Sequence, residues 1–486
     1  MARFQGSEAF GLNAPSKLTL LPFRFERVDE GRYLLANLVG DFVCLSREEF
    51  DRLLALDVAP GDGLYEKAYT SLFIAREGQI APLQILAMRL RSRMAFLEQL
   101  TTLHLFVVTL RCEHSCPYCQ VSRQSQDRAK FDMSEDTAMR ALAIALESPS
   151  PRIKIEFQGG EPLLNFSLIQ KIVENAKADA SRIGKEVEFV IASNLALLNE
   201  RILAFCKANG ILLSTSLDGP SDLHNKNRPR PGGNSHRLAV DGIKAAQRVL
   251  GTDRVGALMT TTEASLARIE QIIDEYLVLG LDGIFLRPLS PYGFAVKTKQ
   301  LYRYDTSRWL EFYKRGLRYI LDINHAGTPF REFYTAIILQ RMLSDRPLGY
   351  VDLRSPAGIG LGALVYNYDG RVFASDEGRM LAEMGDDSFE LGQVSNANYR
   401  SLVLSEKLLR LVAESLTQCA PECHSCVYES HCGADPVYHH ATQGDVLGIK
   451  PLSGFCARQK GIMGILLDLL ENSPRDAEVL HQWGAA

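Results

Sequence analysis

Short apolar runs alternate with amphipathic stretches from about residue 102 onward. Six of these runs have the length and apolar character of strands that are buried on both faces. The predicted strands are 103–110, 152–157, 187–193, 211–217, 255–261 and 283–289. The stretches between them repeat apolar residues at helical spacing, with a start signal at Ser134 and stop signals at Gly210 and Gly280. Strands that alternate with helices in this way predict a parallel α/β sheet.

The pattern leaves the closure of this sheet open. Right-handed crossovers are compatible with a doubly wound open sheet and with a barrel. In both folds, ligands bind at the carboxyl ends of the parallel strands. Four polar or glycine-rich clusters follow predicted strands, namely RCEHSCPYCQ (111–120), GGEP (159–162), 193–194 and 216–219. We therefore expect a functional site along this rim.

The two ends of the chain have different patterns from the middle. The first part alternates apolar and polar residues around DEG (29–31), which indicates a hairpin, and Ser46 then opens a helix. Its sheet edge could bind a peptide as an added strand, or the module could be a purely structural addition. Near the other end, VYNYDGRVFA predicts a second hairpin that turns at Asp369-Gly370. Three domains are expected: 1–100, 101–325 and 326–486.

Composition excludes several classes of protein. The chain has 486 residues, 46% of them hydrophobic and 23% charged, and a formal net charge of -4. This charge is not the basic footprint of a protein that binds nucleic acid. The first residues lack a secretory signal pattern, and no apolar run approaches the ~20 residues of a membrane span. We expect a cytoplasmic protein that binds neither nucleic acid nor membrane.

Eight of the ten cysteines fall in two tight groups. In a reducing cytoplasm such groups indicate metal binding or catalysis more often than disulfides. The first group has the spacing C-x3-C-x2-C, at Cys112, Cys116 and Cys119. A [4Fe–4S] cluster takes one cysteine per iron, so three cysteines would leave one iron open to a substrate or cofactor. A zinc site completed by His114 is the alternative.

This motif after the first strand, with GGEP after the second, resembles the radical S-adenosylmethionine (SAM) enzymes. The resemblance implies a partial (β/α)6 barrel of the TIM type. It also implies that the open iron binds SAM and that an electron from the cluster cleaves SAM to methionine and a 5′-deoxyadenosyl radical. That radical would abstract a hydrogen atom from the substrate, and a donor such as flavodoxin or ferredoxin would supply the electron.

The same resemblance implies roles for individual residues. Cys112, Cys116 and Cys119 would hold the cluster. The residues that would bind SAM are Tyr118, Gly159, Gly160, Glu161, Ser193, Asn194, Ser216, Asp218 and Arg228. Glu161 suits the ammonium group of SAM, and a guanidinium such as Arg228 binds carboxylates in a bidentate manner. For Ser216, Asp218 and Arg228, turn capping and surface charge remain the alternative.

The second group of cysteines supplies four thiolates. Cys423, Cys426 and Cys432 have the spacing C-x2-C-x5-C, and Cys456 follows. Alone, this set suits zinc and iron–sulfur equally. Beside the first motif it resembles a SPASM domain, the extension of many peptide-modifying radical SAM enzymes. The resemblance implies one auxiliary [4Fe–4S] cluster on these four residues.

The sequence departs from the rest of the SPASM pattern. No cysteine occurs in SPAGIGLG, Ser375 stands where the hairpin cysteine is expected, and Pro436 stands beyond Cys432. We therefore expect the other auxiliary cluster to be absent, and Cys419 to be a spare cysteine or a substitute ligand. In sulfatase-maturing relatives, an Asp after the hairpin cysteine acts as a base. Asp376 occupies that place here, and a solvated turn acid is the alternative.

These features together predict a radical SAM oxidoreductase that matures a ribosomally made peptide or protein. Two segments most resemble the maturase of the His-Xaa-Ser system, namely LLPFRF…RYLLANLVGDF and VFASDEGRM. This resemblance implies a substrate with His-Xaa-Ser repeats. A formylglycine-forming sulfatase maturase is one alternative, and the missing hairpin cysteine counts against it. A non-catalytic iron–sulfur or zinc scaffold for peptides is another, and the intact triad and GGEP count against that.

Overall fold

The computed structural model describes residues 17–346 and 350–485, which form two compact units. The smaller unit contains residues up to 95 together with 345–346 and 421–431. The larger unit contains 96–344, 350–420 and 432–485. The expected boundary between a core domain and a C-terminal domain at residue 325 stays a proposal. Within the described residues, no helix combines the length and apolar character needed to cross a membrane.

The smaller unit is built on an antiparallel sheet. Its strands are β2 (Phe23–Arg27), β3 (Arg32–Asn37) and β4 (Phe42–Ser46), and β2 and β3 form the predicted hairpin. The remaining elements are β1 (Leu18–Leu20), β5 (Ile74–Arg76), α1 (Arg47–Leu54), α2 (Gly63–Thr70) and α3 (Ala81–Arg93). Ser46 begins α1 as predicted, because its hydroxyl accepts from the N–H of Glu49 while the Glu49 carboxylate accepts from the N–H of Ser46.

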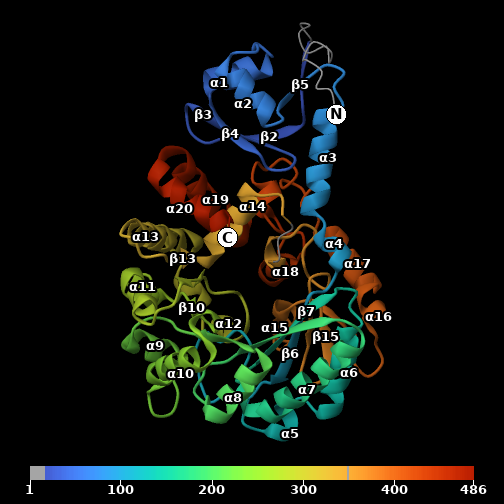
Figure 1. Ribbon diagram of the computed structural model, residues 1–486, viewed down its shortest axis with the longest axis vertical. Helices are drawn as coiled ribbons and strands as arrows, with labels where there is room; N and C mark the ends of the chain where they lie inside the picture. The colour runs from blue at the N-terminus through green and yellow to red at the C-terminus, as the bar shows by residue number, and fades with distance from the viewer. Residues whose placement is uncertain (1–16, 347–349, 486) are drawn as a thin grey trace, which may run out of the picture. The chain divides into compact units, whose positions relative to one another are not determined.

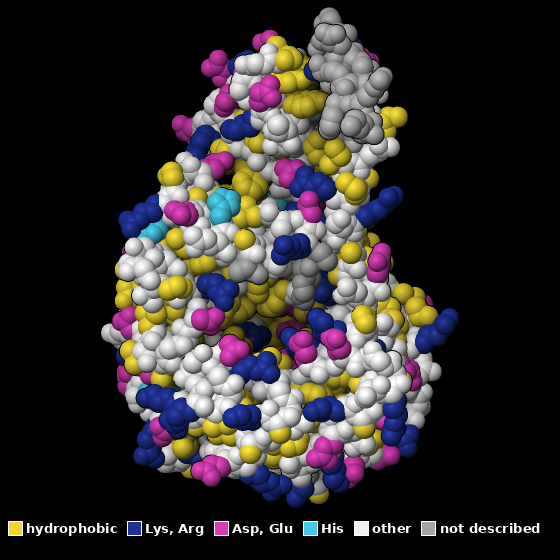
Figure 2. Space-filling model, in the orientation of Figure 1, with side chains coloured by type: hydrophobic (Ala, Val, Ile, Leu, Met, Phe, Trp, Pro, Cys, Tyr) yellow, Lys and Arg dark blue, Asp and Glu magenta, His cyan; other side chains and the backbone are white. Residues whose placement is uncertain are grey.

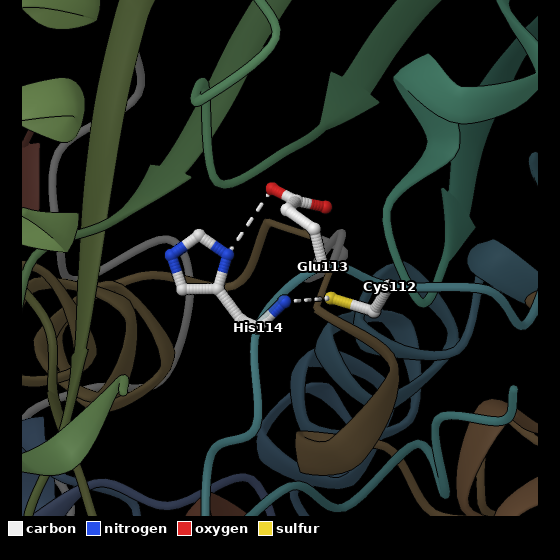
Figure 3. Close-up of side chains that lie close together, drawn as sticks. All are labelled: Cys112, Glu113 and His114. Carbon is white, nitrogen blue, oxygen red and sulfur yellow. Dashed lines mark hydrogen bonds and ion pairs between the residues drawn. The ribbon is translucent and has the colours of Figure 1, made fainter. Parts of the chain in front are cut away.

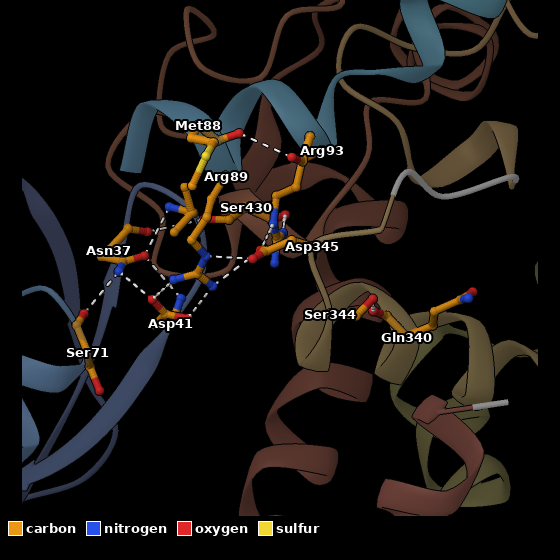
Figure 4. A network of polar contacts seen from close by, with 12 residues as sticks. Asn37, Asp41, Ser71, Met88, Arg89, Arg93, Gln340, Ser344, Asp345 and Ser430 are labelled. Carbon is orange, nitrogen blue, oxygen red and sulfur yellow. Dashed lines mark hydrogen bonds and ion pairs between the residues drawn. The ribbon is translucent and has the colours of Figure 1, made fainter. Parts of the chain in front are cut away.

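Charged contacts hold distant segments of the chain together within the smaller unit. On α3, Arg89 donates to Asp41 at 2.7 Å and to Asp345 at 2.6 Å. Arg93 donates to the same Asp345 at 3.2 Å and to the carbonyl of Ser430 at 3.1 Å. Figure 4 shows these side chains converging from α3, the sheet and the two later segments. Because charge-assisted hydrogen bonds are the strong ones, this network fixes both segments to the unit.

A nine-stranded sheet forms the centre of the larger unit, in the order β12-β10-β9-β8-β7-β6-β14-β15-β16. The six predicted strands are present and parallel: β6 (Leu103–Thr109), β7 (Arg152–Gly159), β8 (Glu186–Ala192), β9 (Leu212–Ser216), β10 (Val255–Thr260) and β12 (Leu286–Arg287). The strand predicted at 283–289 is split. Its first part, β11 (Gly283–Ile284), pairs with β13 (Arg331–Glu332), and the Glu332 carboxylate accepts from the N–H of Leu286.

Helices follow the parallel strands along the chain. The predicted ones are α6 (Glu135–Leu146), α7 (Phe166–Arg182), α8 (Glu200–Asn209), α10 (Ser235–Leu250) and α11 (Ile269–Val278). Ser134 caps α6, and Gly210 and Gly280 end α8 and α11 in left-handed conformations, as predicted. In Figure 1, α6, α7 and α8 lie along the outer side of β6 and β7. This arrangement is the α/β fold that the sequence pattern predicts, and it leaves the inner face of the sheet for a site.

The predicted second hairpin extends this sheet. It consists of β14 (Ala363–Tyr366) and β15 (Arg371–Phe373), and β14 runs parallel to β6. It is followed by β16 (Glu390–Gln393), α15 (Asp376–Ala382), α18 (Pro436–Gln443) and α19 (Gly454–Asn472). The other helices are α4 (Phe96–Gln99), α5 (Arg128–Phe131), α9 (Ser221–Asn227), α12 (Gly293–Lys297), α13 (Thr306–His325), α14 (Phe333–Leu343), α16 (Tyr399–Val403), α17 (Glu406–Glu414) and α20 (Pro474–Ala485).

Candidate functional site

The first cysteine group lies in the loop after β6 and opens into a cavity. Cys112, Cys116 and Cys119 all line one cavity of about 270 Å³ in the larger unit. Backbone bonds hold this loop from two sides, because the N–H of Glu161 donates to the carbonyl of Arg111 and the N–H of Phe294 donates to that of Cys119, both at 2.7 Å. Figure 2 shows a hollow over the region of α12, α15 and α18, with acidic and basic side chains grouped around it.

Two glycines at the end of β7 allow the cysteine loop to approach closely. A Cβ on Gly159 would lie 2.1 Å from the carbonyl oxygen of Thr109, and one on Gly160 would lie 2.3 Å from that of Arg111. Both distances are far below a normal carbon–oxygen contact, and both obstacles are backbone atoms. The two glycines of GGEP are therefore required by lack of space, and both line the cavity beside the cysteines.

The donor set of this loop fits an iron–sulfur cluster. Burial raises the pKa of the Cys112 thiol, and it raises that of Cys116 to about 12. Buried thiols of this kind keep their protons unless a cation replaces them, and a metal centre does so by binding the thiolates. Three such sulfurs on one cavity match the three-cysteine set of a cluster with one open iron.

The zinc alternative needs His114 as a ligand, and its ring is occupied. Cys112, Glu113 and His114 do bring ligand atoms within 4.8 Å of one another. Figure 3 shows the His114 ring turned toward Glu113, with Nδ1 at 3.1 Å from the carboxylate. Its Nε2 lies 2.9 Å from the Ser235 hydroxyl. Both ring nitrogens are thus engaged in hydrogen bonds with the protein, which favours the iron–sulfur assignment.

Glu161 lies behind the cavity wall. Its side chain is fully buried, and burial together with the nearby Glu113 carboxylate raises its pKa to about 7. It accepts hydrogen bonds from the Ser193 hydroxyl at 2.7 Å and from the backbone N–H of Asn194 at 2.8 Å. Ser193 and Asn194 line the cavity. Glu161 therefore positions this part of the rim, while its direct contact with a SAM ammonium stays a prediction.

A buried ion pair organises the opposite part of the rim. Asp218 is fully buried and accepts from the Tyr118 hydroxyl and, at 3.1 Å, from Arg228. The Arg228 guanidinium also lies 5.4 Å from the centre of the Tyr118 ring. Tyr118, Arg228 and Ser216 line the cavity. The surface-charge alternative is wrong for Asp218 and Arg228, whose side chains are 0% and 13% exposed.

One wall of the cavity has an unsatisfied polar group. The Thr215 hydroxyl is buried and has no hydrogen-bond partner among the described residues. It lies on β9 next to Ser216 and lines the same cavity. Buried polar groups are rarely left unpaired, so this hydroxyl indicates room for a polar ligand.

Asp376 lines the same cavity as the cysteines. It opens α15, where the Ser375 hydroxyl caps the helix by accepting from the N–H of Gly378. The buried Arg379 donates to Asp376 at 2.9 Å and to the carbonyl of Val121 at 3.0 Å. The alternative of a solvated turn acid is wrong, since the Asp376 side chain is 16% exposed and paired.

The sequence analysis missed several residues of the cavity wall. Glu156, Gln158 and Arg287 line it, and Glu156 accepts from Gln158 at 2.7 Å. Burial, with a contribution from the Asp376 carboxylate, raises the pKa of Glu156. The signal was present in the strand RIKIEFQG, because polar residues alternate with apolar ones there. Strands of a parallel sheet are normally apolar on both faces, so this alternation marks a face that lines a site.

The four cysteines of the expected auxiliary cluster divide between the two units. Cys423 and Cys426 belong to the smaller unit, in a turn where the N–H of Cys426 donates to the carbonyl of Cys423. Cys432 and Cys456 belong to the larger unit. That these four cysteines bind one cluster stays a prediction. Pro436 is the first residue of α18, a position that favours proline.

Comparisons with known proteins find relatives for the part of the chain that contains the parallel strands and the first cysteine motif. Residues 106–276 match the family model described as the Radical SAM superfamily. An uncharacterized protein of Methanocaldococcus jannaschii is 31% identical over 186 residues, which cover 38% of this chain and 61% of that relative. The match therefore spans less than two thirds of the relative's length.

Two solved structures share the fold. The structure of anSMEcpe with bound AdoMet and Cp18Cys peptide is similar with a TM-score of 0.63 at 18% identity, covering 78% of this chain and 99% of that one. Streptococcus suis SuiB bound to its precursor peptide SuiA is similar with a TM-score of 0.52 at 14% identity, covering 89% and 98%.

The cysteine triad, the glycine pair after the second strand and the parallel strands β7 to β10 fall within the matched region. Residues 106–276, which contain these features, therefore match the radical SAM superfamily.

Proposed function

We propose that this chain is a radical SAM maturase that modifies a peptide or protein substrate. The observation that carries the proposal is the shared cavity of Cys112, Cys116, Cys119 and Asp376. When bound at the three cysteines, a [4Fe–4S] cluster would supply the electron that cleaves SAM and generates a hydrogen-abstracting radical.

The residues around the cavity would bind and orient SAM. Arg228 would bind its carboxylate, and Asp218 holds that guanidinium in place. Ser193 and Asn194 would contact the polar part of the ligand, positioned from behind by Glu161. Gly159 and Gly160 line the same cavity and let the cysteine loop lie close to β7, so we propose that they form the edge facing the amino group. Each of these contacts uses a side chain or backbone segment that is already fixed by the protein.

Asp376 is our candidate for a proton acceptor from the substrate. Arg379 pairs with Oδ1 and orients the carboxylate, so Oδ2 is the atom that we propose to accept the proton. Glu156 and Arg287 share its cavity. A second carboxylate and a guanidinium at the same wall would help to position a polar peptide backbone.

The substrate class rests on likeness to other proteins. The structures of anSMEcpe and SuiB that share this fold were solved with bound peptides. We propose a peptide substrate here as well, with His-Xaa-Ser repeats as the first candidate. An auxiliary [4Fe–4S] cluster on Cys423, Cys426, Cys432 and Cys456 would relay an electron, and flavodoxin or ferredoxin would reduce the first cluster.

Co-expression with a candidate His-Xaa-Ser peptide tests this function. Mass spectrometry should find that the peptide has lost two hydrogen atoms, as expected for a crosslink or oxidation. Co-expression with the Cys112→Ala variant provides the matched control and should leave the peptide unmodified. An unchanged peptide with the wild-type enzyme would contradict the substrate assignment, and a modified peptide with the variant would contradict the radical mechanism.

A further inference from the structure

A second cavity in the larger unit has an unusual lining. It measures about 80 Å³ and is walled by seven aromatic side chains. Three carboxylates, Asp352, Glu377 and Asp435, and two guanidinium groups, Arg287 and Arg458, also line it. A single water occupies about 10–15 Å³ on such a measure, so the cavity has room for one side chain.

The three carboxylates line one cavity and form no ion pair with a basic side chain among the described residues. Within the part of the chain that the structure describes, none of them lies within 4.0 Å of an Arg, Lys or His nitrogen. Hydrogen bonds come instead from the Tyr350 hydroxyl to Asp352 and from the backbone N–H of Tyr438 to Asp435. When all groups are ionised, three negative charges face two positive ones. The lining then carries one excess negative charge.

Burial and the neighbouring carboxylates together disfavour the ionised form of these three groups. Burial and the charge of neighbouring carboxylates raise the pKa of Asp352 and of Asp435 to about 6 and that of Glu377 to about 7. The tyrosines of the cavity have raised pKa values and stay neutral. A bound cation would relieve the repulsion and favour the ionised carboxylates.

Two buried polar groups at this cavity lack partners. Tyr292 and Trp309 are 1% and 2% exposed and line the cavity, and neither the Tyr292 hydroxyl nor the Trp309 indole N–H has a hydrogen-bond partner among the described residues. An indole N–H can only donate. Because an unpaired buried donor is costly, the group that fits here must also carry an acceptor.

A metal ion does not fit this lining. Among the described residues, the one set of three Cys, His, Asp or Glu ligand atoms within 4.8 Å of one another is that of Cys112, Glu113 and His114. Asp352, Glu377 and Asp435 are therefore too far apart to share one ion. Aromatic walls instead stabilise organic cations. Arg458 already lies 5.4 Å from the centre of the Phe455 ring, so these walls accept a guanidinium.

We propose that this second cavity binds the cationic side chain of a Lys or Arg residue of the peptide substrate, with a peptide carbonyl accepting from Trp309. This inference rests on the proposed function. Arg287 lines both cavities, and the consecutive residues Asp376 and Glu377 line the first and the second respectively. A peptide that presents its reacting residue to the first cavity can therefore place a residue close to it in sequence in the second.

Direct binding to the reconstituted full chain, without SAM, tests the inference. Isothermal titration calorimetry would use the amides of N-acetyl-lysine and N-acetyl-arginine, with N-acetyl-norleucine amide and N-acetyl-glutamate amide as neutral and anionic probes. We expect saturable binding of at least one cationic probe. Glu377→Gln should weaken it about tenfold, equivalent to about 1.4 kcal/mol. Glu174→Gln, an exposed change on α7, is the matched control and should leave it unchanged.

Tryptophan fluorescence would locate the bound probe. The chain has two tryptophans, so Trp483→Phe leaves Trp309 of this cavity as the reporter. We expect its emission to change with the same midpoint as the heat signal, and the affinity to rise from pH 5.5 to pH 8 as the carboxylates ionise. If Glu377→Gln is unstable by circular dichroism, Asp352→Asn provides the same test.

Several results would overturn the inference. They are an equal affinity for the norleucine or glutamate probe, no binding of either cationic probe, or full affinity in the stable carboxylate variants. SAM cleavage is measured separately and does not depend on this cavity. A negative binding result alongside normal SAM cleavage would therefore reject the inference and leave the proposed function standing.

Discussion

The two cavities of the larger unit differ in how their carboxylates are paired. In the first, Asp218 is bonded to Arg228, Asp376 to Arg379, and Glu161 to Ser193 and Asn194. In the second, three carboxylates line the cavity without an ion pair in the described residues. The first is thus a preorganised site, and the second would gain from a cation brought by a ligand.

The comparison has a chemical meaning for the proposed reaction. SAM carries a carboxylate, and the first cavity offers it the Arg228 guanidinium that Asp218 holds in place. The peptide must be bound by surfaces that SAM does not occupy, and the second cavity is one of them. On our proposals, the first cavity receives SAM and the reacting residue of the peptide, and the second binds a cationic side chain close to that residue in sequence.

The largest expected effect is the loss of SAM cleavage in Cys112→Ala. Without this thiolate the cluster has two protein ligands in the loop, so we expect 5′-deoxyadenosine to fall to background in reduced, reconstituted protein. Chromatography of the product measures this. Cys206→Ala, at a buried cysteine outside both cavities, should keep the activity. Equal activity in both variants would refute the assignment of the cluster.

Gly160→Ala should cause the next largest loss. Its new Cβ would meet the Arg111 carbonyl oxygen at 2.3 Å, and the cysteine loop would have to move. We expect the free energy of unfolding to fall by about 1–3 kcal/mol and the iron content to drop. Denaturant unfolding and iron analysis measure the two effects. Gly256→Ala on β10 is the control, since no atom lies within 4 Å of its new Cβ.

Asp218→Asn tests the held guanidinium of the first cavity. With its charge partner removed, Arg228 should be less well oriented for a carboxylate. We expect the KM for SAM to rise about tenfold, or about 1.4 kcal/mol, with a smaller change in kcat. Asp222→Asn removes an exposed ion pair with Arg268 and should leave KM unchanged. A fall in kcat alone would argue against a role in binding.

The smallest effect concerns pH and the second cavity. The pKa of Glu377 is about 7 in the folded protein against an ordinary value of 4.5. Between these pH values the folded state binds the proton and the unfolded chain does not, so the stability contributed by this group falls as pH rises. Glu377→Gln should therefore flatten the decline in the free energy of unfolding between pH 5 and 7. Denaturant unfolding over this range measures the slope, and an unchanged slope would contradict the raised pKa of Glu377.

Much of the parallel α/β region could be predicted from the sequence. The six parallel strands, the caps at Ser134 and Gly210 and both hairpins follow from local pattern, because periodicity and capping act over a few residues. The cysteine triad and GGEP are also local, and they lie together because parallel strands bring their carboxyl ends to one edge.

What the sequence did not reveal depends on contacts between distant segments. The split of the strand at 283–289 follows from pairing with β13 and from the Glu332 carboxylate. Neighbouring strands bury Asp218 and Glu161 behind the cavity wall. The sequence motifs therefore identified these two residues as functional but did not show that they position other side chains. The second cavity combines residues from 285 to 458, and no local pattern joins them.

The most direct test of the central claim is to measure iron and 5′-deoxyadenosine in the same anaerobically reconstituted sample. We predict about eight irons per chain, from two four-iron clusters, and formation of 5′-deoxyadenosine once SAM and a reductant are added. About twelve irons would contradict the single auxiliary cluster, and zinc in the tail would remove its redox role. Bound iron without any 5′-deoxyadenosine would contradict the account as a whole.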